Sequence, residues 1–147
     1  MTGRLQGRTI IVTGGASGIG AALCEGFAAE GANAVIADLN LEAGEALATR
    51  IMESGGSASA VRVDVTDRES VATGIAATVE RYGRLDAYFN NAGMNSPMKY
   101  LDVTEANFDL IMKVNVLGVL VGVQEAAKQF IAQGGPGKVV NTASIAG

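Results

Sequence analysis

The sequence predicts an α/β fold in which helices cover both faces of a parallel sheet. Short runs of β-branched residues alternate with longer Ala-rich segments in which apolar residues recur at helical spacing. This alternation is typical of parallel strands joined by right-handed crossover helices. The 147 residues are 48% hydrophobic and 18% charged, and no linker-like or low-complexity stretch divides them. We therefore expect one domain with a well-buried core that spans residues 1–147.

Each predicted strand is a short apolar run, and each predicted helix begins after a turn or a polar cap. The strands are expected at residues 9–12, 33–38, 58–63, 85–90 and 138–142. The helices are expected at residues 18–30, 41–54, 67–82 and 104–132, with a loop over residues 93–101 before the last of them. The limits of the helices are marked by following glycines or by N-cap side chains, namely Gly31, Gly55, Gly83, Asp67 and Thr104.

The reactive and charged residues exclude several classes of protein. The chain has no histidine, which excludes Ser-His-Asp and Cys-His catalysis and histidine metal sites. Cys24 is alone, so we expect no disulfide and no cysteine zinc cluster, and we predict that it packs as a small buried hydrophobe. The net charge of −4 and the pI near 4.8 offer no basic surface for a nucleic acid or an anionic membrane.

The apolar segments of the sequence bear on the cellular location of the protein. The charged start at residues 1–8 is not followed by an apolar core, so no signal peptide is expected. The most apolar stretch, residues 114–123, contains Asn115 and is too short to span a bilayer. A cytoplasmic location is therefore the default expectation.

A glycine-rich turn, Thr-Gly-Gly-Ala-Ser-Gly-Ile-Gly at residues 13–20, joins the first predicted strand to the first helix. Gly14 allows a tight exit from the strand, while Gly18 and Gly20 let the backbone approach a ligand and the helix approach the strand. The helix N-terminus then offers unpaired N–H groups to a phosphate. No Gly-Lys-Ser/Thr follows, which excludes a nucleoside-triphosphate P-loop. The turn predicts a site for a dinucleotide pyrophosphate.

Asp38 ends the second predicted strand. A carboxylate at this place can accept both hydroxyls of an adenosine ribose, and it would repel a 2′-phosphate. Its neighbours Ala37 and Leu39 offer no cation to hold that phosphate. The pattern predicts NAD rather than NADP as cofactor, and the alternative is a solvated carboxylate at a strand end.

Four motifs in this order resemble the short-chain dehydrogenase/reductase family. They are Thr-Gly-x-x-x-Gly-x-Gly at 13–20, Asp64-Val65, Asn90-Asn91-Ala92-Gly93 and Asn-Thr-Ala-Ser at 141–144. The resemblance covers essentially the whole chain but only the N-terminal part of the family fold. It implies a doubly wound, Rossmann-like parallel sheet of strand order 3-2-1-4-5 that lacks the last strands of the family.

The resemblance also implies a set of residues that bind the cofactor. Asp64 would lie near the adenine amino group, with a turn or helix-capping aspartate as the alternative. Ser17 stands where NADP-preferring relatives often carry Arg or Lys, which again favours NAD. The implied cofactor-binding residues are Gly14, Ser17, Gly18, Ile19, Gly20, Asp38, Asp64, Val65, Asn91, Ala92 and Gly93.

Two further residues resemble members of the family's catalytic group. Asn115 would hold a water of the proton relay, with a satisfied core amide as the alternative, and Ser144 would hydrogen-bond the substrate oxygen. The family's Tyr-x-x-x-Lys pair has no match here, because Tyr82, Tyr88 and Tyr100 each lack a lysine four positions later. The chain by itself is therefore expected to bind NAD without turning over a substrate.

The first interpretation of these patterns is an NAD-dependent oxidoreductase that moves hydride between the nicotinamide and a secondary alcohol or ketone. The alternative is a non-catalytic dinucleotide-binding fragment or module, and a purely structural subunit ranks last. Residues 134–138 are similar to relatives that act on polyols, diols and acetoin, and ketoreductases of acyl-carrier-protein substrates are a second possibility. A second apolar stripe on the helix after Thr104 predicts a homo-oligomer, a dimer or tetramer.

Overall fold

A parallel sheet forms the centre of the protein in the computed structural model, which describes residues 3–145. The sheet has five strands in the order β3-β2-β1-β4-β5, and every neighbouring pair is parallel. The expected Rossmann-like strand order 3-2-1-4-5 is confirmed. The strands are β1 (Thr9–Thr13), β2 (Asn33–Asp38), β3 (Ser57–Arg62), β4 (Ala87–Asn90) and β5 (Lys138–Asn141).

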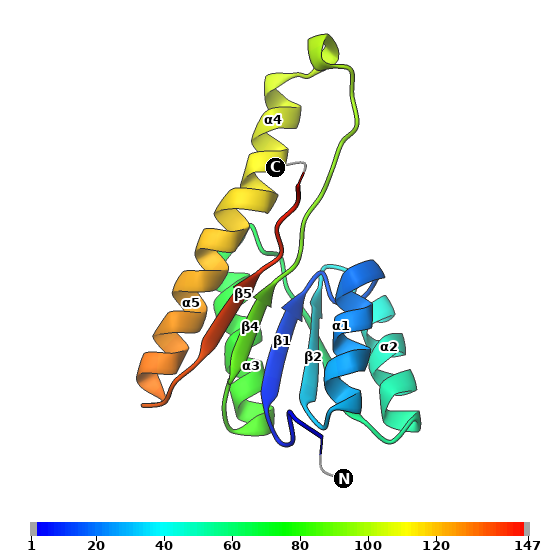
Figure 1. The fold of residues 1–147 in the computed structure, drawn as a ribbon. Helices are drawn as coiled ribbons and strands as arrows, with labels where there is room; N and C mark the ends of the chain where they lie inside the picture. The colour runs from blue at the N-terminus through cyan, green and yellow to red at the C-terminus, as the bar shows by residue number, and fades with distance from the viewer. Residues whose placement is uncertain (1–2, 146–147) are drawn as a thin grey trace.

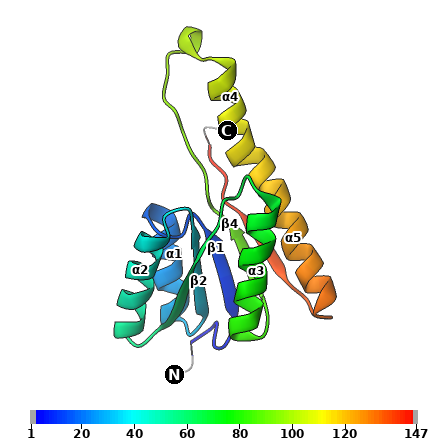
Figure 2. The ribbon, with the colours of Figure 1, turned by 180° about the vertical axis from the view of Figure 1, so that it is seen from behind.

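Helices cover the sheet on both sides, as the alternation of elements predicts (Figures 1 and 2). Two helices lie on one face, α1 (Gly18–Ala29) and α2 (Leu41–Glu53). Two others lie on the opposite face, α3 (Arg68–Tyr82) and α5 (Gly118–Ala132). Before α5 come a short 3-10 turn η1 (Tyr100–Asp102), α4 (Glu105–Met112) and a π-helical turn η2 (Lys113–Leu117).

Each face of the sheet has its own hydrophobic core. Ile10, Ile36 and Leu47 pack on the side of α1 and α2, whereas Val35 and Tyr88 pack on the side of α3 and α5. Cys24 is fully buried in the first core, and burial raises the pKa of its thiol to about 12. The prediction that Cys24 packs as a small hydrophobe is therefore confirmed.

The ends of the helices follow the local signals in the sequence. The side chain of Asp67 accepts a hydrogen bond from the Glu69 amide at 3.0 Å and so caps α3. Thr104 caps α4 in the same way, since its Oγ1 accepts from the Asn107 amide at 3.1 Å. Gly83 ends α3 in the left-handed conformation with φ of 81°.

The fourth strand begins later than expected, at Ala87 instead of residue 85. The reason is that Leu85 is bound by a side chain. The Gln133 amide donates to the Leu85 carbonyl at 2.7 Å, and its Oε1 accepts from the Leu85 N–H at 3.2 Å. This contact between residues far apart in the sequence replaces strand pairing.

The single helix expected over residues 104–132 runs without a break from Glu105 to Ala132 but contains the π-helical turn η2. Its most apolar window has a mean hydropathy of 1.6, with 17% of that window buried, and by length and composition alone the 28-residue helix could cross a membrane. The expectation that this segment is too short is therefore wrong, because the helix extends beyond residues 114–123 at both ends. Its C-terminal half, α5, packs on the sheet through Val121, Ala126 and Phe130.

Candidate functional site

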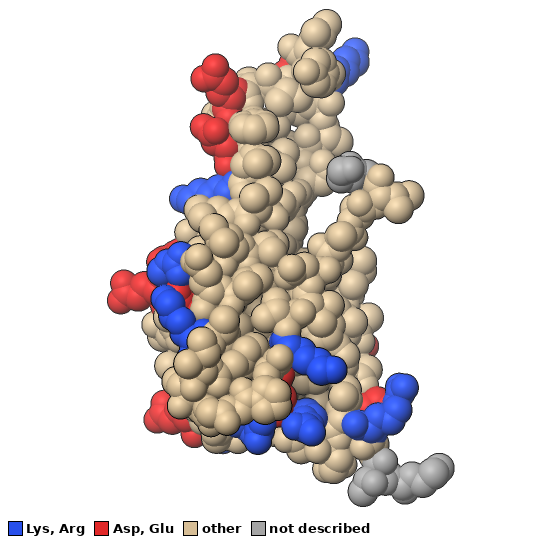
Figure 3. All heavy atoms as spheres, turned by 60° about the vertical axis from the view of Figure 1, so that its left-hand side comes forward, with Lys and Arg blue, Asp and Glu red and all other residues tan. Residues whose placement is uncertain are grey.

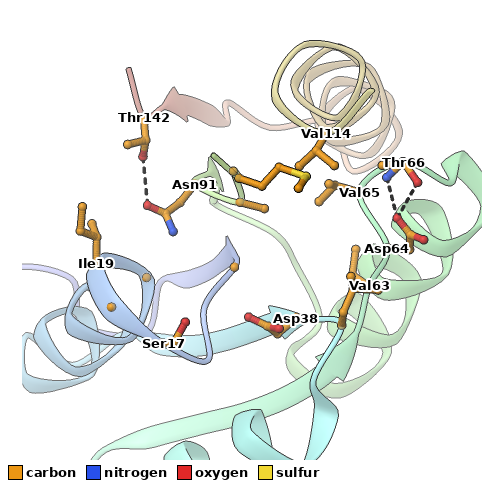
Figure 4. A pocket seen from close by; sticks show the side chains of 17 residues that line it. Ser17, Ile19, Asp38, Val63, Asp64, Val65, Thr66, Asn91, Val114 and Thr142 are labelled. Carbon is orange, nitrogen blue, oxygen red and sulfur yellow. Dashed lines mark hydrogen bonds between the residues drawn. The ribbon is translucent and has the colours of Figure 1, made fainter. Parts of the chain in front are cut away.

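A cleft of about 520 Å³ opens where β1, β2, β3 and β4 end at the same edge of the sheet (Figure 4). Carboxyl ends of parallel strands commonly form ligand sites in open α/β sheets. Every residue that the sequence assigned to the cofactor lines this one cleft. They are Gly14, Ser17, Gly18, Ile19, Gly20, Asp38, Asp64, Val65, Asn91, Ala92 and Gly93.

The glycine-rich turn has no room for side chains at three of its positions, Gly14, Gly15 and Gly20. A Cβ on Gly14 would lie 2.9 Å from the Ala92 Cα, and one on Gly20 would lie 2.1 Å from the Gly14 carbonyl oxygen. Gly18 differs, because a Cβ there would meet nothing within 4 Å, but its φ of 52° is in the left-handed region. The glycines thus bring α1 against β1 and leave the space above Gly18 open.

The N-terminus of α1 faces the cleft with its amides uncapped by side chains. Ser17 holds the N-cap position, yet its side chain makes no capping hydrogen bond, and no acidic residue lies in the first turn. The positive end of the helix dipole is therefore available to an anion.

Asp38 lies across the cleft from this helix end, at the end of β2. Its Oδ2 accepts a hydrogen bond from the Ala16 amide at 3.0 Å, and its Oδ1 accepts from the Asn40 amide at 3.0 Å. The partner of Asp38 in the sheet register is Arg62 on β3, an exposed residue that does not line the cleft. Among the described residues, the charged side chains that line the cleft are both carboxylates, Asp38 and Asp64.

Asp64 forms a turn with the residue two positions later. Its Oδ1 accepts hydrogen bonds from the Thr66 hydroxyl at 2.7 Å and the Thr66 amide at 2.9 Å. These bonds lower the pKa of Asp64, so the carboxylate is charged at neutral pH. Of the alternatives for Asp64, the turn is therefore present, whereas the cap of α3 is Asp67.

The motif at residues 90–93 ties three strands together. Thr13 Oγ1 accepts from the amides of Asn91 and Ala92, each at 3.0 Å, and the Asn91 Nδ2 donates to the Thr13 carbonyl at 3.1 Å. On the other side, the buried Asn90 donates to the Asn141 Oδ1 at 2.9 Å. The ends of β1, β4 and β5 are thus held in one polar network below the cleft.

Asn115 and Ser144 are absent from the lining of the cleft. Asn115 lies in the π-helical turn, where its amide pairs twice with the backbone of Met94. Its Nδ2 donates to the Met94 carbonyl and its Oδ1 accepts from the Met94 amide, both at 2.9 Å. This pairing occupies the side-chain amide of the half-buried Asn115 and holds the loop after β4. Ser144 lies beyond the end of β5 and is exposed.

The tyrosines lie away from the cleft. Tyr88 is buried in the sheet, and burial raises the pKa of its hydroxyl well above the usual range. Tyr100 is exposed in η1, and Tyr82 ends α3. No tyrosine among residues 3–145 lines the cleft.

Several residues that line the cleft carry no motif of their own in the sequence. Leu39 follows Asp38 directly, Val114 precedes Asn115, and Thr142 lies inside the motif at 141–144. These three residues could have been predicted to line the cleft, because each neighbours a predicted site residue or lies within a motif. The remaining lining residues not predicted are Val63, Thr66 and Met94. Figure 4 shows Val63 beside Asp38, and Thr66 next to Asp64, which it binds.

Comparisons with known proteins agree with this geometry. The family model described as short chain dehydrogenase matches residues 8–147. A crystal structure of a short-chain type dehydrogenase/reductase from Mycobacterium marinum superposes with a TM-score of 0.93 at 32% identity, covering 97% of this chain and 58% of that one.

Curated relatives give the same picture at the level of sequence. A sorbitol dehydrogenase of Cereibacter sphaeroides is 40% identical over 144 residues, which are 98% of this chain and 55% of the relative. A 2,5-dichloro-2,5-cyclohexadiene-1,4-diol dehydrogenase of Sphingobium indicum is 42% identical over 97% of this chain and 56% of its own length. A 3beta-hydroxysteroid dehydrogenase of Eggerthella lenta is 37% identical over 97% of this chain and 55% of its own length. The chain thus spans little more than half the length of these relatives.

Proposed function

This chain belongs to the short-chain dehydrogenase/reductase family, and we propose that it is the NAD-binding part of an oxidoreductase acting on a secondary alcohol or ketone. The observation that carries the proposal is the pairing of Asp38 with the uncapped N-terminus of α1 across one cleft. A nicotinamide dinucleotide fits this arrangement, because it presents a ribose diol and a pyrophosphate that match the two groups.

Different residues of the cleft would bind different parts of the cofactor. The amides at the start of α1 would hold the pyrophosphate above Gly18, where the structure leaves space for it. Asp38 would accept the hydroxyls of the adenosine ribose with the lone pairs that Ala16 and Asn40 leave available. Asp64 would accept from the adenine amino group while Val65 and Leu39 contact the ring.

NAD is favoured over NADP by charge. The two charged side chains that line the described cleft are both negative, and a 2′-phosphate would lie against the Asp38 carboxylate without a lining cation to compensate. Arg62 is adjacent to Asp38 in the sheet register but stands outside the cleft.

When bound, the nicotinamide accepts or delivers a hydride. Ser144 would orient the oxygen of the substrate, and Asn115 would contribute to a proton relay from its place beside the loop at Met94. The 147 residues contain no tyrosine followed four positions later by lysine. We therefore propose that these residues alone bind the dinucleotide but do not turn over, and a non-catalytic dinucleotide-binding module remains the second candidate.

The substrate class follows from the relatives only in outline. The relatives are named for sorbitol, for a cyclohexadiene diol and for a 3beta-hydroxysteroid, and all three carry alcohol groups. These names support a small-molecule alcohol or ketone as the substrate. The three compounds differ too much from one another to indicate a narrower substrate class.

A homo-oligomer is proposed from the long helix. Val116 and Leu120 lie one turn apart on it and are 53% and 50% exposed. Figure 3 shows a mostly uncharged surface along the middle of this side of the molecule. The exposed apolar side chains of Val116 and Leu120 favour self-association over a solvated monomer.

Calorimetric titration with NAD⁺, NADH and NADP⁺ tests the proposed cofactor. The wild-type chain is expected to bind NADH, and Gly20→Ala is expected to abolish binding, because the added Cβ would overlap the Gly14 carbonyl at 2.1 Å. Gly26→Ala is the matched control, since a Cβ there meets nothing within 4 Å. A folded wild-type chain that binds none of the three dinucleotides would contradict the proposal.

A further inference from the structure

Thr142 lies directly beyond β5, at the edge of the cleft. Its backbone amide donates to the Asn90 carbonyl at 2.9 Å, which extends the pairing of β5 with β4 by one step. Its hydroxyl lies 3.2 Å from the Asn91 Oδ1, and the side chain lines the cleft (Figure 4). The strand that leads to Ser144 therefore contacts the cofactor side of the site through one hydroxyl.

The direction of this hydrogen bond is set by chemistry. The carbonyl of Thr13 only accepts, so the group of Asn91 that faces it at 3.1 Å must be the Nδ2 donor. The Oδ1 then points to Thr142, and between a carbonyl oxygen and a hydroxyl the hydroxyl must donate. Thr142 thus satisfies the acceptor end of the amide and fixes its orientation.

The Asn91 amide in turn lies against the glycine-rich turn. A Cβ on Gly20 would lie 2.8 Å from the Asn91 Nδ2, and the Thr13 carbonyl that the amide binds directly precedes Gly14. A rotation of this amide would break its bond to Thr13 and press it against Gly20. The Asn91 amide is therefore one of the groups that hold the turn, together with Asp38, which binds the Ala16 amide.

We propose that Thr142 is a positioning residue of the cofactor site: its hydroxyl holds the Asn91 amide, which holds the turn from Thr13 to Gly20. Its effect on cofactor affinity rests on the proposed function, whereas its effect on the turn is a property of the chain itself. The same bond couples the turn to β5, so the strand that presents Ser144 and the phosphate-binding turn would move together.

The test compares three variants of the full chain. Thr142→Val removes the hydroxyl and keeps the shape, and Thr142→Ser restores the hydroxyl. Thr49→Val is the matched control, because Thr49 is exposed on α2 and its hydroxyl bonds only within that helix, to the Glu45 carbonyl at 3.0 Å. Two readouts are measured for each: the Kd for NADH by fluorescence titration, and hydrogen–deuterium exchange of peptides covering residues 12–20 and 89–94 without cofactor.

Thr142→Val is expected to raise the Kd for NADH about fivefold, the effect of one lost hydrogen bond, and to speed exchange in both peptides. Thr142→Ser is expected to stay within about twofold of the wild type, and Thr49→Val is expected to change neither readout. The proposal is overturned if Thr142→Val matches the wild type in exchange, or if Thr142→Ser is as impaired as Thr142→Val, since the methyl group would then matter and not the hydroxyl.

The hydrogen–deuterium exchange measurement needs no cofactor, so it tests the positioning role of Thr142 independently of the proposed NAD binding. If the wild type binds no NADH, the NAD assignment fails, while faster exchange confined to Thr142→Val still supports the positioning role. If the wild type binds NADH and Thr142→Val binds equally well with unchanged exchange, the positioning role alone fails.

Discussion

The carboxylate of Asp38 accepts a hydrogen bond from the backbone amide of Ala16 at 3.0 Å, so the end of β2 holds the glycine-rich turn that follows β1. Its second oxygen binds the Asn40 amide at the start of α2. A residue that the sequence assigns to a ribose therefore also organises the protein around the cleft. Changes at Asp38 are expected to act on the turn as well as on the choice of cofactor.

Cofactor preference depends on the charge of Asp38. The wild-type chain is expected to bind NAD(H) at least about tenfold more tightly than NADP(H), a difference of about 1.4 kcal/mol. Asp38→Ala combined with Leu39→Arg is expected to narrow or reverse this ratio, because it removes the repulsion and adds a cation beside it. Calorimetry with both cofactors measures the ratio, and Arg50→Ala is the control, because Arg50 pairs with the exposed Glu25 and does not line the cleft. Equal or tighter binding of NADP(H) by the wild type would contradict the assignment.

At Gly122, α5 packs tightly against β4. A Cβ there would lie 2.1 Å from the buried Asn90 Oδ1 and 2.8 Å from a ring carbon of Tyr88. Gly122→Ala is therefore expected to destabilise the fold by about 1 to 3 kcal/mol, although alanine is the better helix former. Gly26→Ala, in the exposed middle of α1, is expected to stabilise it by about 0.5 to 1 kcal/mol. Urea unfolding measures both, and equal effects of the two changes would disprove the close contact.

Asp86 anchors the opposite end of the sheet. It is 9% exposed and binds the Thr9 amide, Arg8 and Arg84, each at 2.9 Å. Asp86→Asn is expected to cost about 1.5 kcal/mol in the free energy of unfolding, because the buried acceptor of the Thr9 amide loses its charge, while solvent screens the half-exposed Arg8 and Arg84. Glu25→Gln removes an exposed ion pair to Arg50 and is expected to cost less than about 1 kcal/mol. Equal losses in the two variants would show that the Asp86 cluster contributes no more than a surface pair.

The contribution of Asp86 should depend on pH. Burial acts to raise the pKa of Asp86, but the Thr9 amide and the two arginines outweigh it, so the folded pKa lies below the ordinary value. Because the pKa of Asp86 is lower in the folded protein, its charged form stabilises the fold at pH values above the unfolded pKa of about 3.9. This stabilisation is lost as the pH falls through the folded pKa. The stability difference between the wild type and Asp86→Asn is therefore expected to be constant from pH 7 to about 5 and to shrink below about pH 4. A difference that shrinks near neutral pH would point to another group.

Self-association is expected through the exposed face of the long helix. The wild-type chain is expected to sediment as a dimer or larger species at micromolar concentration, and Val116→Ser with Leu120→Gln is expected to shift it toward monomer. Ile131→Gln is the control, because Ile131 is 80% exposed but near the other end of α5. A monomeric wild type that unfolds cooperatively would show that this surface needs no partner.

Local rules explain what could be predicted from the sequence. Helix caps at Asp67 and Thr104, and the stop at Gly83, follow from hydrogen bonds within a few residues, so the sequence pattern contains them. The strand order came from resemblance to a family whose motifs recur in order at the strand ends. The members of the cleft could be named for the same reason, because parallel strands bring their carboxyl ends to one edge.

By itself, then, the sequence determined the alternation of strands and helices, the capping of the helices and the identity of most residues that gather at the cleft. Only the tertiary structure decided how those residues are held. The pairing of Asn115 with Met94, of Leu85 with Gln133 and of Thr142 with Asn91 joins residues distant in the chain. The π-helical turn within the last helix also emerged only in the fold. The reason is that such contacts depend on how packed elements meet in space, which no periodicity along the chain encodes.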